Sequence, residues 1–456
     1  MNPAAQSRLV QALDSFNRTE RSQALSTLAE HYIAGGPEPG ERVNLHIHSF
    51  FSYNAKGYSP SRIAWEARRQ GLYAVGLCDF DVLDGLEEFL AAGLTLGLRT
   101  TVNLETRAFL PEYAQVEINS PGEPGVVYIM GAGFARPPPA NTGAATTLAR
   151  YRQQAAERNS ALVARINARL PEIAVDYEME VKPLSPGLCP TERHIVRAYR
   201  EKANATFRKT AARLDFWARL MKAKPSEVAA WEKDVPVIEE KIRAALVKRG
   251  GLGYEQPSAR MFPPVKDFIA WVRECHALPM VTWLDGMAPG EANALELLEC
   301  LRAQGCCALN IIPERNHHID DHDLRKIKLR KLAEIVAAAE KLQLPINIGT
   351  EMNKDGQPFV DDTGVEALKP YQAVFLRGAR LMVGQTLLTR YADFSYVGSA
   401  AESEFGNELR RKNAFFEAVG RLRPCTKAIA AQLSAMGPEK AFACLRDSAR
   451  QSSWAV

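Results

Sequence analysis

The chain has 456 residues, which is enough for one large barrel with insertions or for two to three average domains. Its 57 basic and 53 acidic residues nearly cancel, and this balance argues against a nucleic-acid or membrane-surface partner. No apolar run approaches the ~18 residues of a membrane span, and the first residues lack the apolar core of a signal peptide. The eight cysteines form no C-x-x-C pair, so we expect free thiols in a cytoplasmic protein.

Near residue 41 the sequence changes from a helical pattern to an alternation of predicted strands and helices. Residues 1–40 are predicted to be a helical segment that ends in the Gly- and Pro-rich stretch AGGPEPGE. Ser59 is the predicted N-cap of the helix that follows, with Pro60 at its first position and Gly71 at its end. The patterns that follow residue 40 predict strands at 42–48, 73–80, 99–109 and 125–134, and helices at 59–71 and 86–97.

The alternation is interrupted between about residues 136 and 263. This region is rich in Arg, Lys, Glu and Ala and is predicted to be a helical insertion, whose interleaved charges indicate a solvated surface. Alternation then resumes, with strands predicted at 278–284, 306–313 and 344–350 and helices at 265–277, 290–305 and 321–343. Residues 361–456 are predicted to be a helical C-terminal extension.

Seven strands, each followed by helical material, predict a parallel sheet. A closed barrel of seven units, residues 41–360 including the insertion, fits better than an open sheet, because polar residues gather at the predicted C-terminal ends of the strands. Barrel enzymes assemble their sites at that end. The residues concerned are His46, His48, Asp79, Glu105, Asp285, Glu314 or Arg315, and Glu351.

His46 and His48 form the most informative pair. Successive strand side chains point to opposite faces, so these two imidazoles share a face and can present two nitrogens to one metal ion. The alternative is a pair of solvated or hydrogen-bonded histidines at a strand tip.

The stretch NLHIHSFFS resembles the first motif of the polymerase and histidinol phosphatase (PHP) superfamily. AVGLCDFDVLDGLEEF resembles the second motif through Asp79, Asp81 and Gly85, although Phe80 stands where the family has a metal-binding His. NLETRAF resembles the third motif, whose Glu, here Glu105, bridges metals in the family. The resemblance covers roughly residues 41–360. It implies a distorted seven-stranded, TIM-like barrel that binds two or three metal ions and hydrolyses phosphoesters.

The later motifs depart from the family pattern. CPTERHIVRAY matches the segment G-R-x-H-(I/F)-A only through Arg193 and His194. The substituted positions are Tyr128 and Trp283, each where relatives have His, Glu351 for Asp, and Asn353 for His. For Trp283, one reading is an aromatic ring that fills a vacated metal pocket, and the other is a ring that stacks on substrate.

The surviving residues predict a site for one or two divalent ions. Its metal ligands would be His46, His48, Glu105 and Glu351, with Asp79 or Asp285 serving a second ion. Because histidines of the family pattern are replaced, manganese, iron or magnesium is favoured over a nitrogen-rich tri-zinc cluster. Zinc is a further candidate for the divalent ion.

Catalytic and substrate roles follow from the same resemblance. The catalytic candidates are Asp79, Glu105, Arg193 and His194, and the phosphate-binding candidates are Arg107 and Arg315. The alternatives are that Arg107 pairs with a carboxylate and that Arg193 and His194 only cap their helix. In ERNHHIDDHD, residues 314–323, ligation by His317, His318 or His322 competes with a helix N-cap at Asp320 or Asp321.

The sequence therefore predicts a metal-dependent phosphoesterase that acts on a small phosphorylated metabolite. The alternative is a catalytically degenerate barrel of the same superfamily that binds a ligand or a partner.

Overall fold

The computed structural model describes residues 2–32, 37–256 and 261–455, so part of the predicted linker, residues 34–36, lies outside the described residues. One seven-stranded sheet runs in the order β1 to β7. Its strands are β1 Val43–Ile47, β2 Ala74–Phe80, β3 Arg99–Phe109, β4 Val126–Ala132, β5 Leu278–Trp283, β6 Ala308–Ile311 and β7 Ile346–Ile348.

The sheet closes between its first and last strands. Glu351, just after β7, donates its backbone N–H to the His46 carbonyl at 2.8 Å and accepts the His48 N–H at 2.9 Å. This bridge at the C-terminal end of β1 completes a distorted TIM-like barrel, as predicted.

The expectation of an entirely parallel sheet is wrong at one strand. β4 pairs antiparallel with both β3 and β5, whereas the other neighbouring pairs are parallel. The connection from β3 to β4 contains only a short 3₁₀ turn, Pro111–Tyr113, and no crossover helix. A strand that returns without a crossover must run antiparallel to its predecessor.

Helices cover the outside of the barrel, because its outward strand faces are apolar and must be buried. Ser59 caps α3 by accepting a hydrogen bond from the Arg62 N–H at 3.0 Å, as its position before Pro60 predicts. The covering helices are α3 Pro60–Arg69, α4 Leu86–Leu96, α10 Val265–Glu274, α11 Ala294–Ala303 and α13 His322–Lys341, with the single turn α12 Glu314–His317 after β6.

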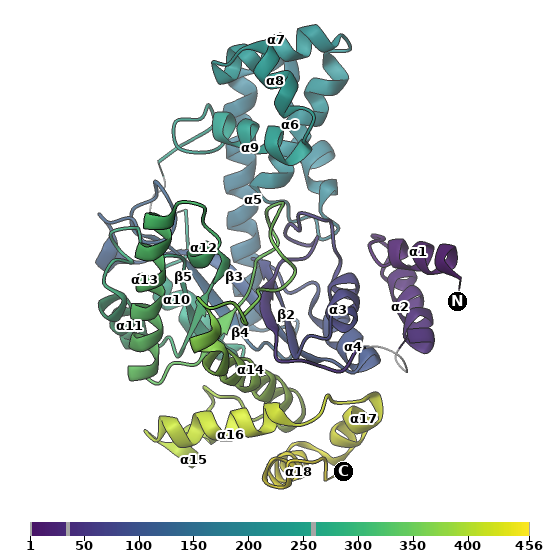
Figure 1. The fold of residues 1–456 in the computed structure, drawn as a ribbon, viewed down its shortest axis with the longest axis vertical. Coiled ribbons are helices and arrows are strands. Elements are labelled where there is room, and N and C mark those ends of the chain that lie inside the picture. Colours follow the sequence, from purple (N-terminus) through teal and green to yellow (C-terminus); the bar gives the residue numbers. More distant parts are fainter. Residues whose placement is uncertain (1, 33–36, 257–260, 456) are drawn as a thin grey trace.

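The insertion between β4 and β5 projects from one end of the barrel (Figure 1). It contains α5 Gly143–Arg169, α6 Glu192–Thr206, α7 Thr210–Met221, α8 Pro225–Trp231 and α9 Val235–Leu246. Its buried apolar side chains, which include Trp217 and Tyr199, form a hydrophobic cluster separate from that of the barrel. Since Tyr53 follows β1 and its ring lies 5.3 Å from that of His194, the insertion stands over the C-terminal end of the barrel.

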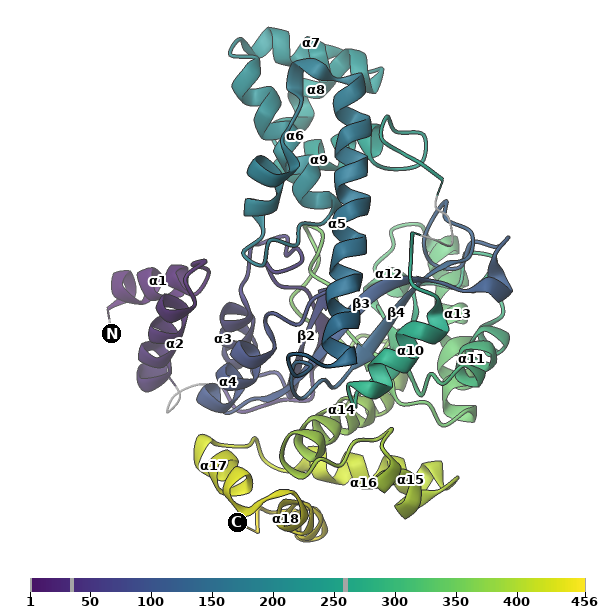
Figure 2. The same ribbon diagram turned by 180° about the vertical axis from the view of Figure 1, so that it is seen from behind.

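The remaining helices lie beside and beneath the barrel (Figure 2). α1 Pro3–Ala12 and α2 Arg18–Tyr32 form the N-terminal segment. α14 Gln372–Ala392 crosses the N-terminal end of the strands, where Thr386 Oγ1 donates to Thr101 Oγ1 at 3.2 Å. Below it lie α15 Ser399–Phe405, α16 Leu409–Arg421, α17 Lys427–Met436 and α18 Pro438–Gln451.

α14 and α16 approach one another so closely that glycine is required at their contact. A Cβ at Gly420 would lie 1.7 Å from the Arg380 carbonyl oxygen. Gly420→Ala is expected to destabilise the protein by about 2 kcal/mol or more, because the helices must separate to admit the methyl group. Urea unfolding measures this. Gly143→Ala, a helical glycine with no neighbour nearer than 3.4 Å to the added Cβ, is the control. Equal effects of both substitutions would contradict the close contact.

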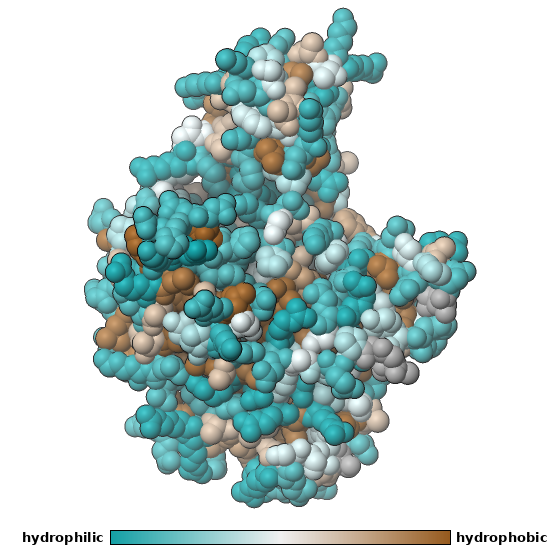
Figure 3. Space-filling model, in the orientation of Figure 1, coloured by the Kyte–Doolittle hydropathy of each residue, from teal (hydrophilic) through white to brown (hydrophobic). Residues whose placement is uncertain are grey.

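The surface is mainly hydrophilic on the face shown in Figure 3. Within the described residues, no helix is both long and apolar enough to cross a membrane. The eight cysteines are all free, as predicted.

Candidate metal centre

Two histidines and one glutamate meet at the C-terminal end of the barrel. His46 lies in β1, His48 follows it directly, and Glu105 lies in the long strand β3. Glu105 Oε2 is 3.5 Å from Nε2 of both histidines. One ligand atom from each residue lies within 4.8 Å of the others, and all three side chains are buried. The structure thus brings together three of the four side chains that were predicted to be metal ligands.

Several polar atoms of this cluster have no hydrogen-bond partner within the described part of the chain. Among the described residues, no hydrogen bond reaches Nδ1 or Nε2 of His46, Nε2 of His48 or Oε2 of Glu105. Buried polar atoms without partners cost free energy, so several of them facing one another indicate a site that binds a ligand. Two imidazole nitrogens and a carboxylate oxygen suit a divalent ion such as zinc, manganese or iron. The residues present therefore fit one such ion.

A hydrogen-bond chain orients His48. Ser52 Oγ donates its only proton to Asp79 at 2.7 Å, so it can only accept from His48 Nδ1, which lies 3.3 Å away. Nδ1 therefore carries a proton, so the neutral form of this imidazole has its lone pair at Nε2, the nitrogen nearest Glu105. Asp79 also accepts the N–H and the hydroxyl of Ser49, both at 2.7 Å. Asp79 thus fixes the loop that carries His48.

Ser49 and Ser52 were not assigned roles from the sequence. The signal was present, because both serines belong to the motif that follows the His-x-His pair. Their hydrogen bonds to Asp79 position the loop that carries His48, and Ser52 also orients the His48 ring.

The electrostatics of the cluster favour a cation. Burial alone would raise the pKa of Glu105, but the two imidazoles lower it to about 2, so this carboxylate is anionic. Burial disfavours a charged imidazole, yet the Cys78 thiol and the Glu105 carboxylate together raise the pKa of His46 well above its usual value. A cation bound at this cluster must therefore displace a proton from His46.

Glu351 lies beside the cluster but is paired with an arginine. Its Oε2 accepts a hydrogen bond from Arg315 Nη2 at 2.9 Å and a longer one from Gln357 Nε2 at 3.4 Å. Burial raises the pKa of Glu351, but Arg315 and then His46 outweigh it and lower that pKa. Glu351 is therefore an anionic carboxylate close to the cluster and outside the group of three ligands.

Phe80 occupies the position where a third imidazole was expected from the family pattern. Its ring stacks on that of His48, with centroids 4.6 Å apart and planes inclined by 14°. Tyr128 lies 6.1 Å from the Phe80 ring, and burial raises the pKa of its hydroxyl to about 12. Both side chains are therefore neutral, and the Phe80 ring lies directly against His48.

Because phenylalanine cannot ligate a metal, we expect one ion, or at most two, at this centre. Phe80→His is expected to tighten manganese binding by about tenfold, since it adds an imidazole beside His48. Isothermal titration calorimetry measures the affinity, and Phe80→Leu, which removes the ring without adding a ligand, is the control.

Anomalous scattering at the manganese edge would count the ions directly in the native protein. Three peaks at the end of the barrel would show that the expected count is wrong. A peak bound only by His317, His318 and His322 would show that the location is wrong.

Trp283 packs in the core and Asp285 forms an ion pair, so neither side chain is free to contact a substrate or an ion. Trp283 is fully buried in the apolar core and pairs in register with Ile311. A Cβ on Gly286 would lie 3.0 Å from both the Trp283 ring and Lys331 of α13, so the ring extends toward the helix layer and is not available to stack on substrate. Asp285 accepts a hydrogen bond from Lys328 Nζ at 2.8 Å.

Arg107, a phosphate-binding candidate, and Arg193, a catalytic candidate, each form an ion pair. Arg107 pairs with Glu123 at 2.9 Å rather than with Glu105. Arg193 pairs with Glu240 on α9 and lies over the Tyr53 ring.

His194 completes the capping box of α6. Its Nδ1 accepts the Thr191 N–H at 3.0 Å. Burial and then the nearby Arg197 lower the pKa of His194 to about 3, so the ring is neutral. In this structure, the helix-capping alternative describes His194 better than a catalytic role.

The histidine-rich stretch 314–323 does not gather into a cluster. Asp321 caps α13 by accepting the N–H groups of Asp323 and Leu324, and His322 is exposed. His317 Nε2 lies 3.7 Å from Asp361 Oδ1. Within the described ranges, the group of three around Glu105 is the one set of such ligands that lie this close together.

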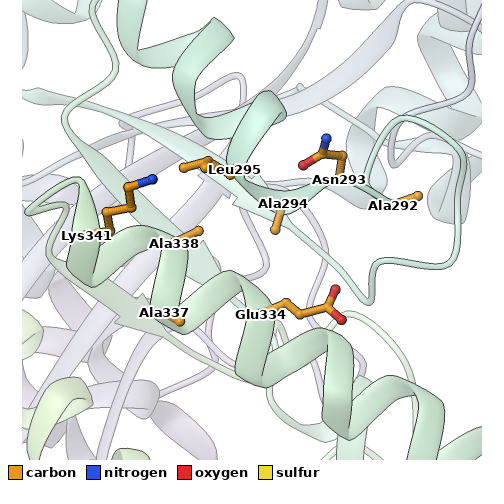
Figure 4. A pocket seen from close by; sticks show the side chains of 8 residues that line it. All are labelled: Ala292, Asn293, Ala294, Leu295, Glu334, Ala337, Ala338 and Lys341. Carbon is orange, nitrogen blue, oxygen red and sulfur yellow. The ribbon is translucent and has the colours of Figure 1, made fainter.

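A surface pocket of about 410 Å³ lies between α11 and α13 (Figure 4). Its lining includes alanines and Leu295, with Asn293, Glu334 and Lys341 as the polar residues. None of the metal-centre residues lines it, so this pocket is separate from the candidate centre.

Comparisons with known proteins give structural likenesses only. No protein-family model and no curated protein matches the sequence. An amidohydrolase from Chromobacterium violaceum, solved with bound sulfate and no metal, has a TM-score of 0.47 and 16% identity, covering 69% of this chain and 88% of its own. A protein from Bifidobacterium adolescentis, described as a metal-dependent phosphoesterase, has a TM-score of 0.45 and 17% identity, covering 74% of this chain and 98% of its own. Neither likeness is close enough to assign an activity.

Proposed function

We propose that this protein is a metal-dependent hydrolase that cleaves phosphoric esters of a small metabolite. The observation that carries the proposal is the buried group His46, His48 and Glu105, whose ligand atoms face one another without partners at the end of the barrel where such enzymes act. The resemblance of the surrounding motifs to those of PHP phosphoesterases supports the choice of ester.

The ion would be held by Nε2 of the two histidines and by the Glu105 carboxylate. When bound, it supplies Lewis-acid activation of a phosphoryl oxygen and lowers the pKa of an attacking water. Ser52 and Asp79 keep the His48 tautomer that presents a lone pair. The anionic Glu105 balances part of the ion's charge.

Arg315 is the strongest candidate to receive the phosphate. Its side chain is 40% exposed, and within the described residues its guanidinium hydrogen-bonds to Glu351. Arg107 and Arg193 are each held by another carboxylate, Glu123 and Glu240. A guanidinium with free donors beside the metal ligands can bind a phosphoryl oxygen pair.

The activity is tested with protein purified without chelator. We expect about one equivalent of a transition metal and, after manganese is added, hydrolysis of p-nitrophenyl phosphate that EDTA abolishes. Less than about a tenth of an equivalent of metal, with no hydrolysis of a panel of phosphomonoesters after manganese addition, would overturn the proposal.

A ligand-binding barrel without catalysis is the second candidate. It is favoured by Phe80, which replaces a ligand with a ring stacked on His48, and by Trp283, which is turned toward the helix layer. A barrel with this function would hydrolyse none of the phosphomonoesters after manganese addition, so the same experiment separates the two.

A further inference from the structure

Glu351 is held next to the metal ligands by its own backbone. Its N–H and carbonyl bond to His46 and His48, and its φ is +64°, in the left-handed region that non-glycine residues seldom adopt. This fixed backbone leaves only the side-chain torsions of Glu351 to decide where its buried carboxylate points.

The backbone around Arg315 is also anchored by hydrogen bonds. Asn316, the next residue of α12, donates to the Leu284 carbonyl at 3.0 Å and to the Ile312 carbonyl at 3.1 Å. Lys328, itself paired with Asp285, donates to the Arg315 carbonyl at 3.3 Å. The Arg315 backbone is therefore anchored, while its half-exposed guanidinium reaches Glu351 from the solvent side.

The charges of these groups do not balance once a divalent ion is added. With neutral histidines, Glu105 leaves one positive charge of the ion uncompensated, and the Glu351–Arg315 pair is neutral. If the Glu351 carboxylate turns to the ion, the ion becomes neutralised and Arg315 is left with an unpaired positive charge. An unpaired guanidinium beside the ion is a receptor for an anion.

We infer that Glu351 is shared between Arg315 and the cation, so that cation binding releases Arg315 to bind the phosphate group of the substrate. The inference rests on the proposed function and adds an order to it, with the metal binding first and the anionic substrate second. Glu351 would then serve as a metal ligand only in the loaded protein, which accounts for its distance from the group of three in this structure.

The first test uses manganese alone, titrated by calorimetry. Arg315→Ala is expected to tighten manganese binding about 3- to 10-fold, because Glu351 is no longer held. The gain should vanish when Glu351→Gln is combined with it. Arg107→Ala removes the same charge from the same end of the barrel and is the control. An equal gain in Arg107→Ala, or a gain that persists in the double variant, would overturn the inference.

The second test uses inorganic phosphate on metal-free protein. Glu351→Gln removes the charge that holds Arg315, so it should tighten phosphate binding about 3- to 10-fold without any metal. The double variant Glu351→Gln/Arg315→Ala should lose that gain. Unchanged phosphate affinity in Glu351→Gln would overturn the inference. This outcome does not depend on catalysis, so it is distinguishable from a failure of the proposed activity.

Discussion

His46→Ala and Glu105→Ala are each expected to abolish metal binding, with at least a 100-fold loss of manganese affinity. Each removes one of the three clustered groups, which among the described residues are the His, Cys, Asp or Glu side chains that lie this close together. The loss of any one of these donors weakens the site whether or not Glu351 also turns to the ion. Calorimetric titration and metal content after purification both measure the effect.

Asp81→Ala is the matched control for this prediction. Asp81 is a neighbouring carboxylate that accepts a hydrogen bond from Thr106 Oγ1 at 2.6 Å and is not part of the group of three. Most of the metal affinity should survive its removal. A loss in Asp81→Ala as large as that in Glu105→Ala would place the ion elsewhere.

Thermal unfolding is a second, independent test of metal binding in the same variants. Manganese at a hundred times its dissociation constant stabilises the folded native protein by about 2.7 kcal/mol. The ligand variants should show no such manganese-dependent shift, whereas Asp81→Ala should keep it. A shift that persists in His46→Ala would contradict binding at the candidate centre.

Much of the fold was predictable because each element has a clear local period. All seven strands lie within their predicted ranges, and β3 matches its range completely. The direction of β4 was not predictable in this way, since a strand's residues do not encode its direction. The absence of a helix between β3 and β4 was the signal for the antiparallel return.

The candidate metal centre was predictable from two short motifs, because strand alternation places His46 and His48 on one face. The ion-pair partners of the basic candidates were not predictable from the sequence. Glu123, which pairs with Arg107, and Glu240, which pairs with Arg193, lie in other segments of the chain. Tertiary contacts of this kind select one partner among many carboxylates, and no local pattern identifies it.

Asp79→Ala is expected to lower manganese affinity about 10- to 100-fold and to destabilise the metal-free protein by about 2 to 4 kcal/mol. Asp79 was predicted to be catalytic, or a ligand of a second ion. In the structure its two oxygens accept three hydrogen bonds from Ser49 and Ser52, and it is almost fully buried. Its removal leaves those donors unpaired and frees the Ser52 hydroxyl to rotate.

The loss of affinity would act through His48. Once Ser52 no longer donates to Asp79, it can donate to His48 Nδ1, and the imidazole proton then moves to Nε2, where it blocks the ion. Calorimetry and urea unfolding measure the two effects separately. Asp84→Ala is the control, because Asp84 follows the same strand but pairs with Arg152 near the surface and should cost at most about 1 kcal/mol. Complete loss of metal binding in Asp79→Ala, equal to that in His46→Ala, would instead identify Asp79 as a direct ligand.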